Sequence, residues 1–353
     1  MNQRSELVRP KVSICITSHN YSRWVSDAVE SALTQSYEPI EVIVADDGST
    51  DGSLEVLRVY GDRIRVLALA HHGQRAAGSA AFEESSGEIV IFLDADDMLD
   101  RDIVRQVVDA FDREPRPVFV QFRLRTIDED GFDIGRDRPA RRGVLPSGDL
   151  RAVVLQRRNW YYQLTSGCAY SASVLRELLP APLLQDDVGS LDHHLNESIA
   201  LFGPIRSIDE IGGSYRAHGS GVSAVASDDA VHPRRMIHIT RASFADVARA
   251  AAKLHLDYPD DPDTLLDPAY LGWCLWSLRI DPGAHPIATD RRRALVRRGV
   301  RASLTHPLFP WRHRAKRAIW FVLVGVAPRR LVPSVLRWYR PDGPRIIGGQ
   351  VVA

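Results

Sequence analysis

The sequence predicts an α/β protein with a mostly parallel sheet flanked by helices, followed by a mainly helical C-terminal region. Short apolar runs that suit buried strands alternate with helix-like segments over the first 113 residues. Two of these runs end in clusters of aspartates, at 46–47 and 94–97. After about residue 232 the apolar spacing is helical, with Trp, Leu and Arg prominent. Strands that alternate with helices favour a parallel, twisted sheet.

Composition limits the classes of protein that this chain can be. Its 353 residues, 44% of them apolar, suffice for one large domain or two ordinary ones. Charged residues make up 25% and the net charge is zero, which does not indicate disorder. Three widely spaced cysteines form neither a metal-binding pair nor a disulfide framework. The N-terminal segment has no apolar core of the signal-peptide type, so we expect a cytosolic protein.

The elements of the first half follow from periodicity and composition. Nearly uninterrupted β-rich runs predict buried strands at 11–17, 40–45, 63–69 and 88–93. Helical spacing or a small, alanine-rich composition predicts helices at 22–36, 53–60, 74–86 and 101–113.

Beyond residue 113 the pattern is looser. Residues 117–128 predict one or two further strands, and 136–148 read as a loop that could cover a site. Further helices are expected near 148–157 and 171–179 and at 191–202. We expect a catalytic domain over residues 1–230 and a helical, basic region over 231–353.

The aspartates at the strand ends lie where an α/β sheet binds ligands. Asp94 and Asp96 could both approach one Mg²⁺ ion, which takes carboxylates and substrate phosphates as ligands. The alternative is that Asp94–Asp97 cap the following helix. Asp46 and Asp47 likewise either form a strand–turn–helix junction or accept a hydrogen bond from a nucleobase.

Four motifs follow one another along the chain: KVSICITSHNY, EVIVADDGSTD, GEIVIFLDADD and, at 207–223, SIDEIGGSYRAHGSGVS. Together they resemble the motifs of family 2 glycosyltransferases, which are usually inverting enzymes of the GT-A, Rossmann-like fold. The resemblance covers about residues 11–223 and implies transfer of a sugar from a nucleotide-diphosphate donor to a hydroxyl acceptor. It also implies assistance by Mg²⁺ or Mn²⁺. Many relatives have Pro-Thr-Tyr-Asn where this chain has Thr17-Ser18-His19-Asn20, a difference that weakens any assignment of base or sugar.

The resemblance also implies roles for single residues. Nucleotide binding is expected of Thr17, Ser18, His19, Asp46, Asp47 and Asp94. Metal binding is expected of Asp94, Asp96 and His218, with Asp96 the direct ligand.

Asp192 matches the place of the family's catalytic base, at the start of a late helix. Inverting transfer needs a carboxylate that takes the proton of the acceptor hydroxyl. Without the resemblance Asp192 would be read as a helix cap, and Asp186 and Asp187 are the nearest competitors for its role.

Other residues are candidates with ordinary structural alternatives. Arg75 could reach a phosphate or be solvated, and Arg216 could simply pair with an acidic neighbour on the surface. His193 and His194 are expected to be surface or packing residues. The aromatic run at 160–162 could be a platform for an acceptor sugar or part of a core.

The C-terminal region is strongly basic: residues 291–345 hold fifteen Lys and Arg and one acidic residue, Asp342. The apolar run Ala318–Ala327 has ten residues, against about twenty needed to span a bilayer. Basic residues on both sides of it suit an interfacial helix, so 313–340 is a candidate for peripheral membrane contact at the inner face of the cell membrane. A buried helix or a protein-docking surface is the alternative. No nucleic-acid partner is expected, because no such motif is present.

A glycan or a lipid-linked precursor in cell-surface polysaccharide assembly is the acceptor that the resemblance suggests. Two rival functions remain. One is a degenerate relative that binds nucleotide sugar without turnover, and the other is a sugar nucleotidyltransferase, which also uses paired carboxylates.

Overall fold

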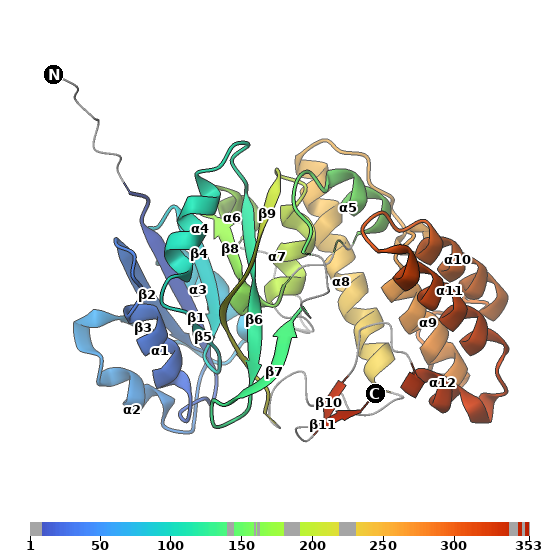
Figure 1. The fold of residues 1–353 in the computed structure, drawn as a ribbon, viewed down its shortest axis with the longest axis horizontal. Helices are drawn as coiled ribbons and strands as arrows, with labels where there is room; N and C mark the ends of the chain where they lie inside the picture. The colour runs from blue at the N-terminus through green and yellow to red at the C-terminus, as the bar shows by residue number, and fades with distance from the viewer. Residues whose placement is uncertain are drawn as a thin grey trace. The chain divides into compact units, whose positions relative to one another are not determined.

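The computed structural model describes residues 9–139, 145–158, 160, 163–179, 191–218, 231–338, 345–347 and 350–352. Internal contacts divide the chain into two compact units (Figure 1). The first unit consists of Met1–Arg151 and Tyr161–Arg216. The second consists of Ala152–Trp160 and Ala217–Ala353.

The first unit is built on one sheet with the strand order β3-β2-β1-β4-β8-β6-β9-β5, and β7 pairs with β6. Its strands are β1 (Val12–Ser18), β2 (Ile40–Asp46), β3 (Arg65–Ala68), β4 (Ile89–Asp94), β5 (Met98–Leu99), β6 (Phe119–Ile127), β7 (Asp133–Arg138), β8 (Cys168–Ser171) and β9 (Ile205–Arg216). The predicted α/β class is confirmed. The sheet is mixed, however, and less parallel than predicted. β3, β2, β1 and β4 run parallel, as do β6 and β9, but β8, β7 and β5 pair antiparallel with their neighbours.

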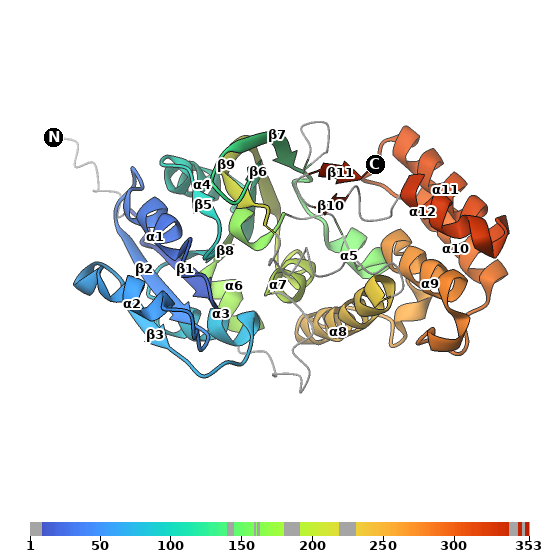
Figure 2. The ribbon, with the colours of Figure 1, turned by 90° about the horizontal axis from the view of Figure 1, so that it is seen from below.

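Helices cover both faces of this sheet (Figure 2). They are α1 (Val25–Leu33), α2 (Ser53–Arg58), α3 (Gln74–Glu83), α4 (Ile103–Phe111), α6 (Ala172–Leu178) and α7 (Leu191–Ile199). The elements predicted over the first 113 residues are all present, and the helices are a few residues shorter than predicted. The single strand β6 occupies the segment for which one or two strands were expected. Strands β5, β7, β8 and β9 were not predicted, and β7 extends to Arg138, inside the segment 136–148 that was expected to be a loop.

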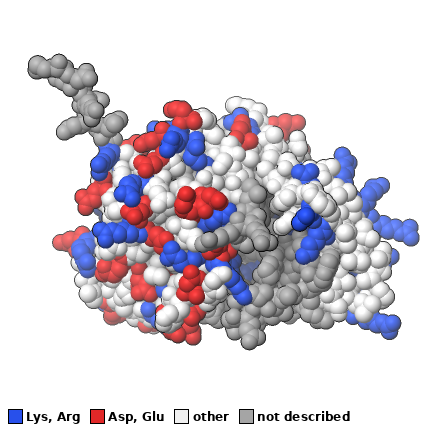
Figure 3. Space-filling model, in the orientation of Figure 1, with Lys and Arg blue, Asp and Glu red and all other residues white. Residues whose placement is uncertain are grey.

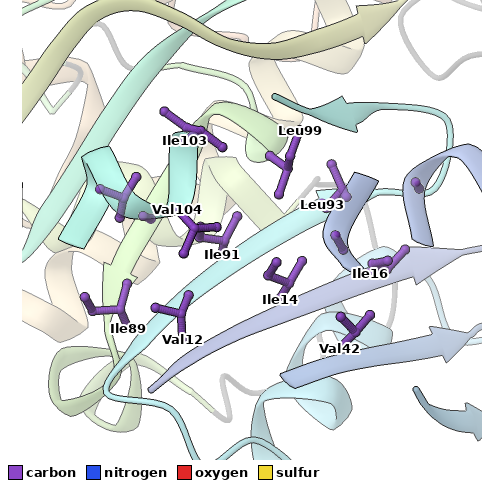
Figure 4. Packing of buried hydrophobic residues seen from close by; sticks show 14 of the residues in the cluster. Val12, Ile14, Ile16, Val42, Ile89, Ile91, Leu93, Leu99, Ile103 and Val104 are labelled. Atoms are coloured by element: carbon purple, nitrogen blue, oxygen red, sulfur yellow. The ribbon is translucent and has the colours of Figure 1, made fainter. Parts of the chain in front are cut away.

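The main core lies between the sheet and helices α1, α2 and α4. Figure 4 shows that alternate residues of β1 and β4 point into it, among them Ile14, Ile16, Ile91 and Leu93. Because successive side chains of a strand point to opposite faces, Thr17 and Asp94 lie on the other face of the sheet. The position of the functional groups therefore follows from which residues fill the core.

The second unit is mainly helical, as predicted. It contains α8 (Val231–Lys253), α9 (Pro268–Ile280), α10 (Arg292–Leu304), α11 (Trp311–Val326) and α12 (Val332–Trp338), and α5 (Arg151–Arg157) lies almost wholly in it. A second hydrophobic core joins α9, α10, α11 and α12. At its end, β10 (Arg345–Ile347) pairs antiparallel with β11 (Gln350–Val352), a strand pair that was not predicted. The three cysteines are buried and free.

Candidate functional site

The carboxyl ends of β1, β2 and β4 lie side by side. In the parallel register, Ser18 is opposite Asp46 and Thr17 is opposite Asp94. All of these side chains except Asp94 are buried, and Asp94 is half-buried. The sequence-predicted nucleotide-binding residues of the three strands therefore meet at one edge of the sheet, where ligands of α/β proteins bind.

A turn of three carboxylates follows β4. Asp94, Asp96 and Asp97 offer ligand atoms that all lie within 4.8 Å of one another. Ser166 fastens this turn: its hydroxyl donates to Asp97 Oδ2 at 2.6 Å and accepts the backbone N–H of Asp94 at 3.1 Å. Asp97 Oδ1 accepts the backbone N–H of Arg216 at 2.9 Å. Both oxygens of Asp97 are thus used by the protein, whereas Asp94 and Asp96 are better placed to be ligands.

The electrostatics of this turn suit a cation. Burial and the Asp96 and Asp192 carboxylates raise the pKa of Asp94 well above its usual range. Burial and the Asp96 and Asp94 carboxylates do the same to the pKa of Asp97. A cation among these groups would relieve the like-charge repulsion. Oxygen-only ligands fit a hard divalent ion such as Mg²⁺ or Mn²⁺.

Asp192 lies in the first turn of α7 and is buried. Its charge is one of the causes of the raised pKa of Asp94, so the two carboxylates are electrostatic neighbours. Asp192 Oδ1 accepts the backbone N–H of His193 at 2.8 Å and lies 3.1 Å from the Nδ1 of that ring. His193, expected to be a surface or packing residue, therefore contacts the predicted base directly.

Gln74, at the start of α3, connects β4 with α7. Its side-chain N–H donates to Asp94 Oδ1 at 2.5 Å, and its side-chain oxygen accepts the backbone N–H of Leu191 at 3.5 Å. Leu191 immediately precedes Asp192. Gln74 is therefore suited to hold the predicted base against the acidic turn.

Arg216, the last residue of β9, braces the other side of the turn. This buried guanidinium donates from Nε to the backbone oxygen of Asp96 at 2.9 Å. It also donates to the backbone oxygen of Glu129 at 3.1 Å and to Asp27 at 2.9 Å. Arg216 does pair with an acidic neighbour at the surface, the half-exposed Asp27, but its own guanidinium is buried beside the candidate metal ligands.

The two aspartates after β2 have different environments. Asp47 accepts the backbone N–H groups of His72 and Gly73, both at 2.8 Å, so it is engaged in holding that loop. Asp46 accepts the backbone N–H of Ser49 through Oδ1, and its buried Oδ2 has no hydrogen-bond partner within the described ranges. The same is true of the buried hydroxyl of Ser18. Asp46 is therefore better suited than Asp47 to receive a base.

His19 lies beside this pair. Its Nδ1 donates to the backbone oxygen of Asp47 at 2.7 Å, which fixes the tautomer with a proton on Nδ1. Its ring stacks on His71, with ring centroids 4.1 Å apart. The two imidazoles therefore form a face-to-face stack, and both rings contact the backbone oxygen of Asp47.

Of the remaining predicted residues, only Arg75 is linked to this edge, because it follows Gln74 in α3. His218 belongs to the second unit, and its role as a ligand stays a prediction. Asp186, Asp187, Tyr161 and Tyr162 lie outside the described residues, and Trp160 is fully buried, as expected of a core residue. Arg75 is buried in the first turn of α3 rather than solvated.

The sequence did not identify Gln74, Ser166 or Asp97 as residues of the site. For Arg216 it predicted only an ion pair on the surface. Only Asp97 carried a local signal, because it adjoins Asp94-x-Asp96. Ser166 is 72 residues from Asp94, and Arg216 is 120 residues from Asp96. Pairings over such separations leave no spacing pattern in the sequence.

Known proteins share both the sequence and the fold of the chain. Residues 13–179 match the family model described as glycosyl transferase family 2. An uncharacterized glycosyltransferase of Nostoc sp. is 34% identical over 230 residues, which are 62% of this chain and 70% of that protein. A chondroitin synthase of Escherichia coli is 34% identical over 125 residues, but these cover 35% of this chain and only 18% of that protein.

Two solved structures share the fold. The S. aureus TarS 1–349 structure has a TM-score of 0.54 and 15% identity, covering 97% of this chain and 95% of that one. The mannosyltransferase PcManGT from Pyrobaculum calidifontis, solved with GDP-Man and Mn²⁺, has a TM-score of 0.50 and 19% identity, covering 91% and 87%. Identity this low speaks for the fold alone, which is that of GT-A glycosyltransferases. The family match and the Nostoc relative show that the chain belongs to glycosyl transferase family 2 and is a glycosyltransferase.

Proposed function

We propose that the protein transfers a sugar from a nucleotide-diphosphate donor to a hydroxyl of a glycan or lipid-linked acceptor, with inversion at the anomeric carbon. The observation that carries the proposal is the Gln74 bridge, which hydrogen-bonds Asp94 and the start of α7, where Asp192 lies. One carboxylate starts α7, where it can take a proton, and the other starts the acidic turn that suits a metal-bound diphosphate. An inverting transferase needs both groups in one site.

In this proposal the donor lies along the ends of the three strands. Asp46 Oδ2 and the Ser18 hydroxyl receive the base, with Thr17 and the stacked His19 beside them. The N-terminus of α3, with the buried Arg75, supplies positive charge toward the diphosphate. Two fold relatives support such a donor: TarS was solved with UDP-GlcNAc and PcManGT with GDP-Man.

A divalent cation, Mg²⁺ or Mn²⁺, bound by Asp94 and Asp96 would neutralise charge on the leaving diphosphate. The protein's own groups do the rest. Asp192 accepts the proton of the acceptor hydroxyl, His193 and Gln74 hold that end of α7, and Arg216 and Ser166 hold the acidic turn. A glycan acceptor agrees with relatives named chondroitin synthase and hyaluronan synthase, although the matches span 18% or less of those proteins. In this scheme the first unit, within residues 1–230, is the catalytic domain, and the enzyme acts in the cytoplasm.

The test is the thermal stability of the full chain against a panel of nucleoside diphosphates and nucleotide sugars, with and without Mn²⁺ or Mg²⁺. A ligand that binds the folded state raises the midpoint by mass action. We expect a metal-dependent shift with one base, lost in Asp96→Ala and retained in Asp109→Ala, which removes an exposed carboxylate on α4. No shift with any nucleotide, in a folded protein, would contradict the proposal.

Turnover then separates the rival functions. With the donor so identified, we expect release of free nucleoside diphosphate, reduced about 10²–10⁴-fold in Asp192→Asn while the thermal shift persists. Release of pyrophosphate from a nucleoside triphosphate and a sugar phosphate would instead indicate a nucleotidyltransferase. Binding without any release, from a panel that includes glycan and lipid-linked acceptors, would indicate a degenerate relative.

A further inference from the structure

Helix α11 is apolar on two opposite faces over its second half. Trp320, Phe321 and Val324 on one face are fully buried in the core of the second unit. The opposite face exposes a row that we call the α11 stripe: Ile319 is 51% exposed, Val322 43%, Leu323 38% and Val326 71%. A helix that is apolar all round is normally buried all round, so the α11 stripe lacks the polar character of an ordinary solvent face.

Contacts with α9 and α10 fix which face of α11 points outward. Gly299 of α10 lies so close to the Phe321 ring that a Cβ there would come within 2.1 Å of it. Arg279 of α9 donates from Nε to the backbone oxygen of Val324 at 2.9 Å, and its Nη2 donates to that of Ala327. The helix is therefore held along its inner side, and the α11 stripe is a fixed feature of the surface.

The surroundings of the α11 stripe carry positive charge and one exposed tryptophan. Trp311 at the start of the helix is 71% exposed, and the guanidinium of exposed Arg312 lies 5.7 Å from its ring centroid. Arg329 and Arg330 are exposed just beyond its end. Residues 291–338 contain thirteen Lys and Arg and no Asp or Glu. In Figure 3 blue side chains project from the visible face of α10, α11 and α12, and no red ones are seen there.

We propose that the α11 stripe docks the protein on an anionic lipid surface, with Ile319 and Leu323 at the acyl boundary and Arg312 and Arg330 at the headgroups. The charge favours lipid over a protein partner, because residues 291–338, which hold basic residues and no acidic one, complement a uniformly anionic surface. Tryptophan beside arginine is typical of a side chain at the membrane interface. None of the described helices is long and apolar enough to cross a bilayer, so the contact is peripheral. This docking does not depend on the donor or the chemistry proposed above.

The test is co-sedimentation of the full chain with vesicles of equimolar phosphatidylglycerol and phosphatidylcholine, and with vesicles of phosphatidylcholine alone. We expect binding to the anionic vesicles at low salt and much weaker binding at high salt or to the neutral ones. The double variant Ile319→Asp, Leu323→Asp should bind at least about tenfold more weakly. Arg312→Glu with Arg330→Glu should lose on the order of fivefold for each charge.

A matched control makes the same kind of substitution, apolar to Asp, at exposed residues of the first unit. Val59 and Phe132 are exposed apolar residues of the first unit, 80% and 71% exposed, so Val59→Asp, Phe132→Asp removes two apolar side chains and adds two negative charges. This variant should bind anionic vesicles like the wild type, and the circular dichroism of all variants should match it. Equal binding by the stripe variant and the control would overturn the proposal. The proposal would also be overturned if the wild type did not bind vesicles but formed a dimer that the stripe substitutions dissociate. The α11 stripe would then join two copies of the chain.

Discussion

The side-chain amide of Gln74 donates a hydrogen bond to Asp94 Oδ1 at 2.5 Å. The other end of the same amide accepts the backbone N–H of Leu191, so one side chain ties the end of β4 to the start of α7. These two elements carry Asp94 and Asp192, the two groups on which the proposed transfer depends. The start of α7, with the proposed base, is thus tied to the acidic turn by a residue that carries no charge and that the motifs do not include.

Replacing Gln74 should therefore lower turnover more than stability. We expect Gln74→Leu to reduce the rate of nucleoside diphosphate release by roughly tenfold to a hundredfold, because α7 loses its register against β4. The free energy of unfolding should fall by only about 1 kcal/mol, the net value of an ordinary hydrogen bond. Initial rates and urea unfolding measure the two effects. Glu83→Gln, at an exposed position of the same helix, is the control, and a rate for Gln74→Leu equal to that of the control would contradict the assigned role.

Arg216→Met should destabilise the first unit and weaken donor binding together. The substitution leaves the buried backbone oxygen of Asp96 without its donor, and we expect a loss of roughly 3 kcal/mol in the free energy of unfolding. Arg23→Met is the matched control, because Arg23 also pairs with the 129–130 turn, but through side chains that are all more than half exposed. It should cost less than about 1 kcal/mol. Urea unfolding measures both losses. Similar losses of unfolding free energy for the two variants would show that the buried hydrogen bonds of Arg216 stabilise the protein no more than the exposed ion pairs of Arg23 do.

Gly213→Ala should disturb the acidic turn through its neighbour β5. A Cβ at Gly213 would lie 2.5 Å from the backbone oxygen of Met98, the first residue of β5, which follows Asp97 directly. Because backbone cannot rotate away as a side chain can, we expect a loss of about 1–3 kcal/mol and a smaller metal-dependent thermal shift. Gly283→Ala, where the nearest atom is 3.6 Å away, should stay within about 0.5 kcal/mol of the wild type. If the metal-dependent thermal shift of Gly213→Ala equals that of the wild type, then the position of β5 does not affect the candidate metal site.

His306 makes the second unit sensitive to acid. Burial and the nearby Arg157 and Arg317 guanidiniums lower the pKa of His306 to about 3, from an ordinary value of 6.5. The unfolded chain therefore takes up a proton that the folded one does not, and the free energy of unfolding falls as the pH drops from 6.5 toward 3. The loss should reach about 2 kcal/mol by pH 5.

His306→Gln should remove this pH dependence, so that its stability relative to the wild type improves steadily between pH 7 and pH 5. Thermal midpoints recorded across that range provide the measurement. His238→Gln, at an exposed position of α8, controls for the loss of an imidazole. A constant difference between His306→Gln and the wild type across the range would mean that His306 takes up its proton in the folded state as well.

Local patterns predicted the parts of the fold that are themselves local. Apolar runs marked β1, β2 and β4, and their ends marked the edge where the aspartates meet. β8 has only four residues, and β9 contains Asp209-Glu210 and Gly212-Gly213, which interrupt any alternation of apolar and polar residues. Both strands form because the sheet supplies neighbours for them, β8 between β4 and β6 and β9 between β6 and β5.

The residues of the site likewise divide into those that local sequence predicts and those that it does not. The carboxylates at 46–47 and 94–97 stand next to the strands that position them, so their convergence could be predicted. Asp97 and Ser166, or Gln74 and Leu191, meet only because the chain returns to the same place 69 and 117 residues later. Sequence spacing does not predict such contacts. The burial that raises the pKa of Asp94 follows from these long-range contacts and not from the residues next to Asp94 in the sequence.

The hydrogen bonds between Arg216 and the Asp94–Asp97 turn also imply an order of events while the chain is being synthesised. The backbone N–H of Arg216 bonds to Asp97 from 119 residues further along the chain. At about 5–20 residues per second a ribosome needs roughly 6 to 24 seconds to travel that distance. During this interval the nascent chain already holds the Asp94–Asp97 turn but not the arginine that fastens it. A newborn chain should therefore gain its affinity for cation and nucleotide in one late step, when β9 joins the sheet, and not gradually as its aspartates emerge.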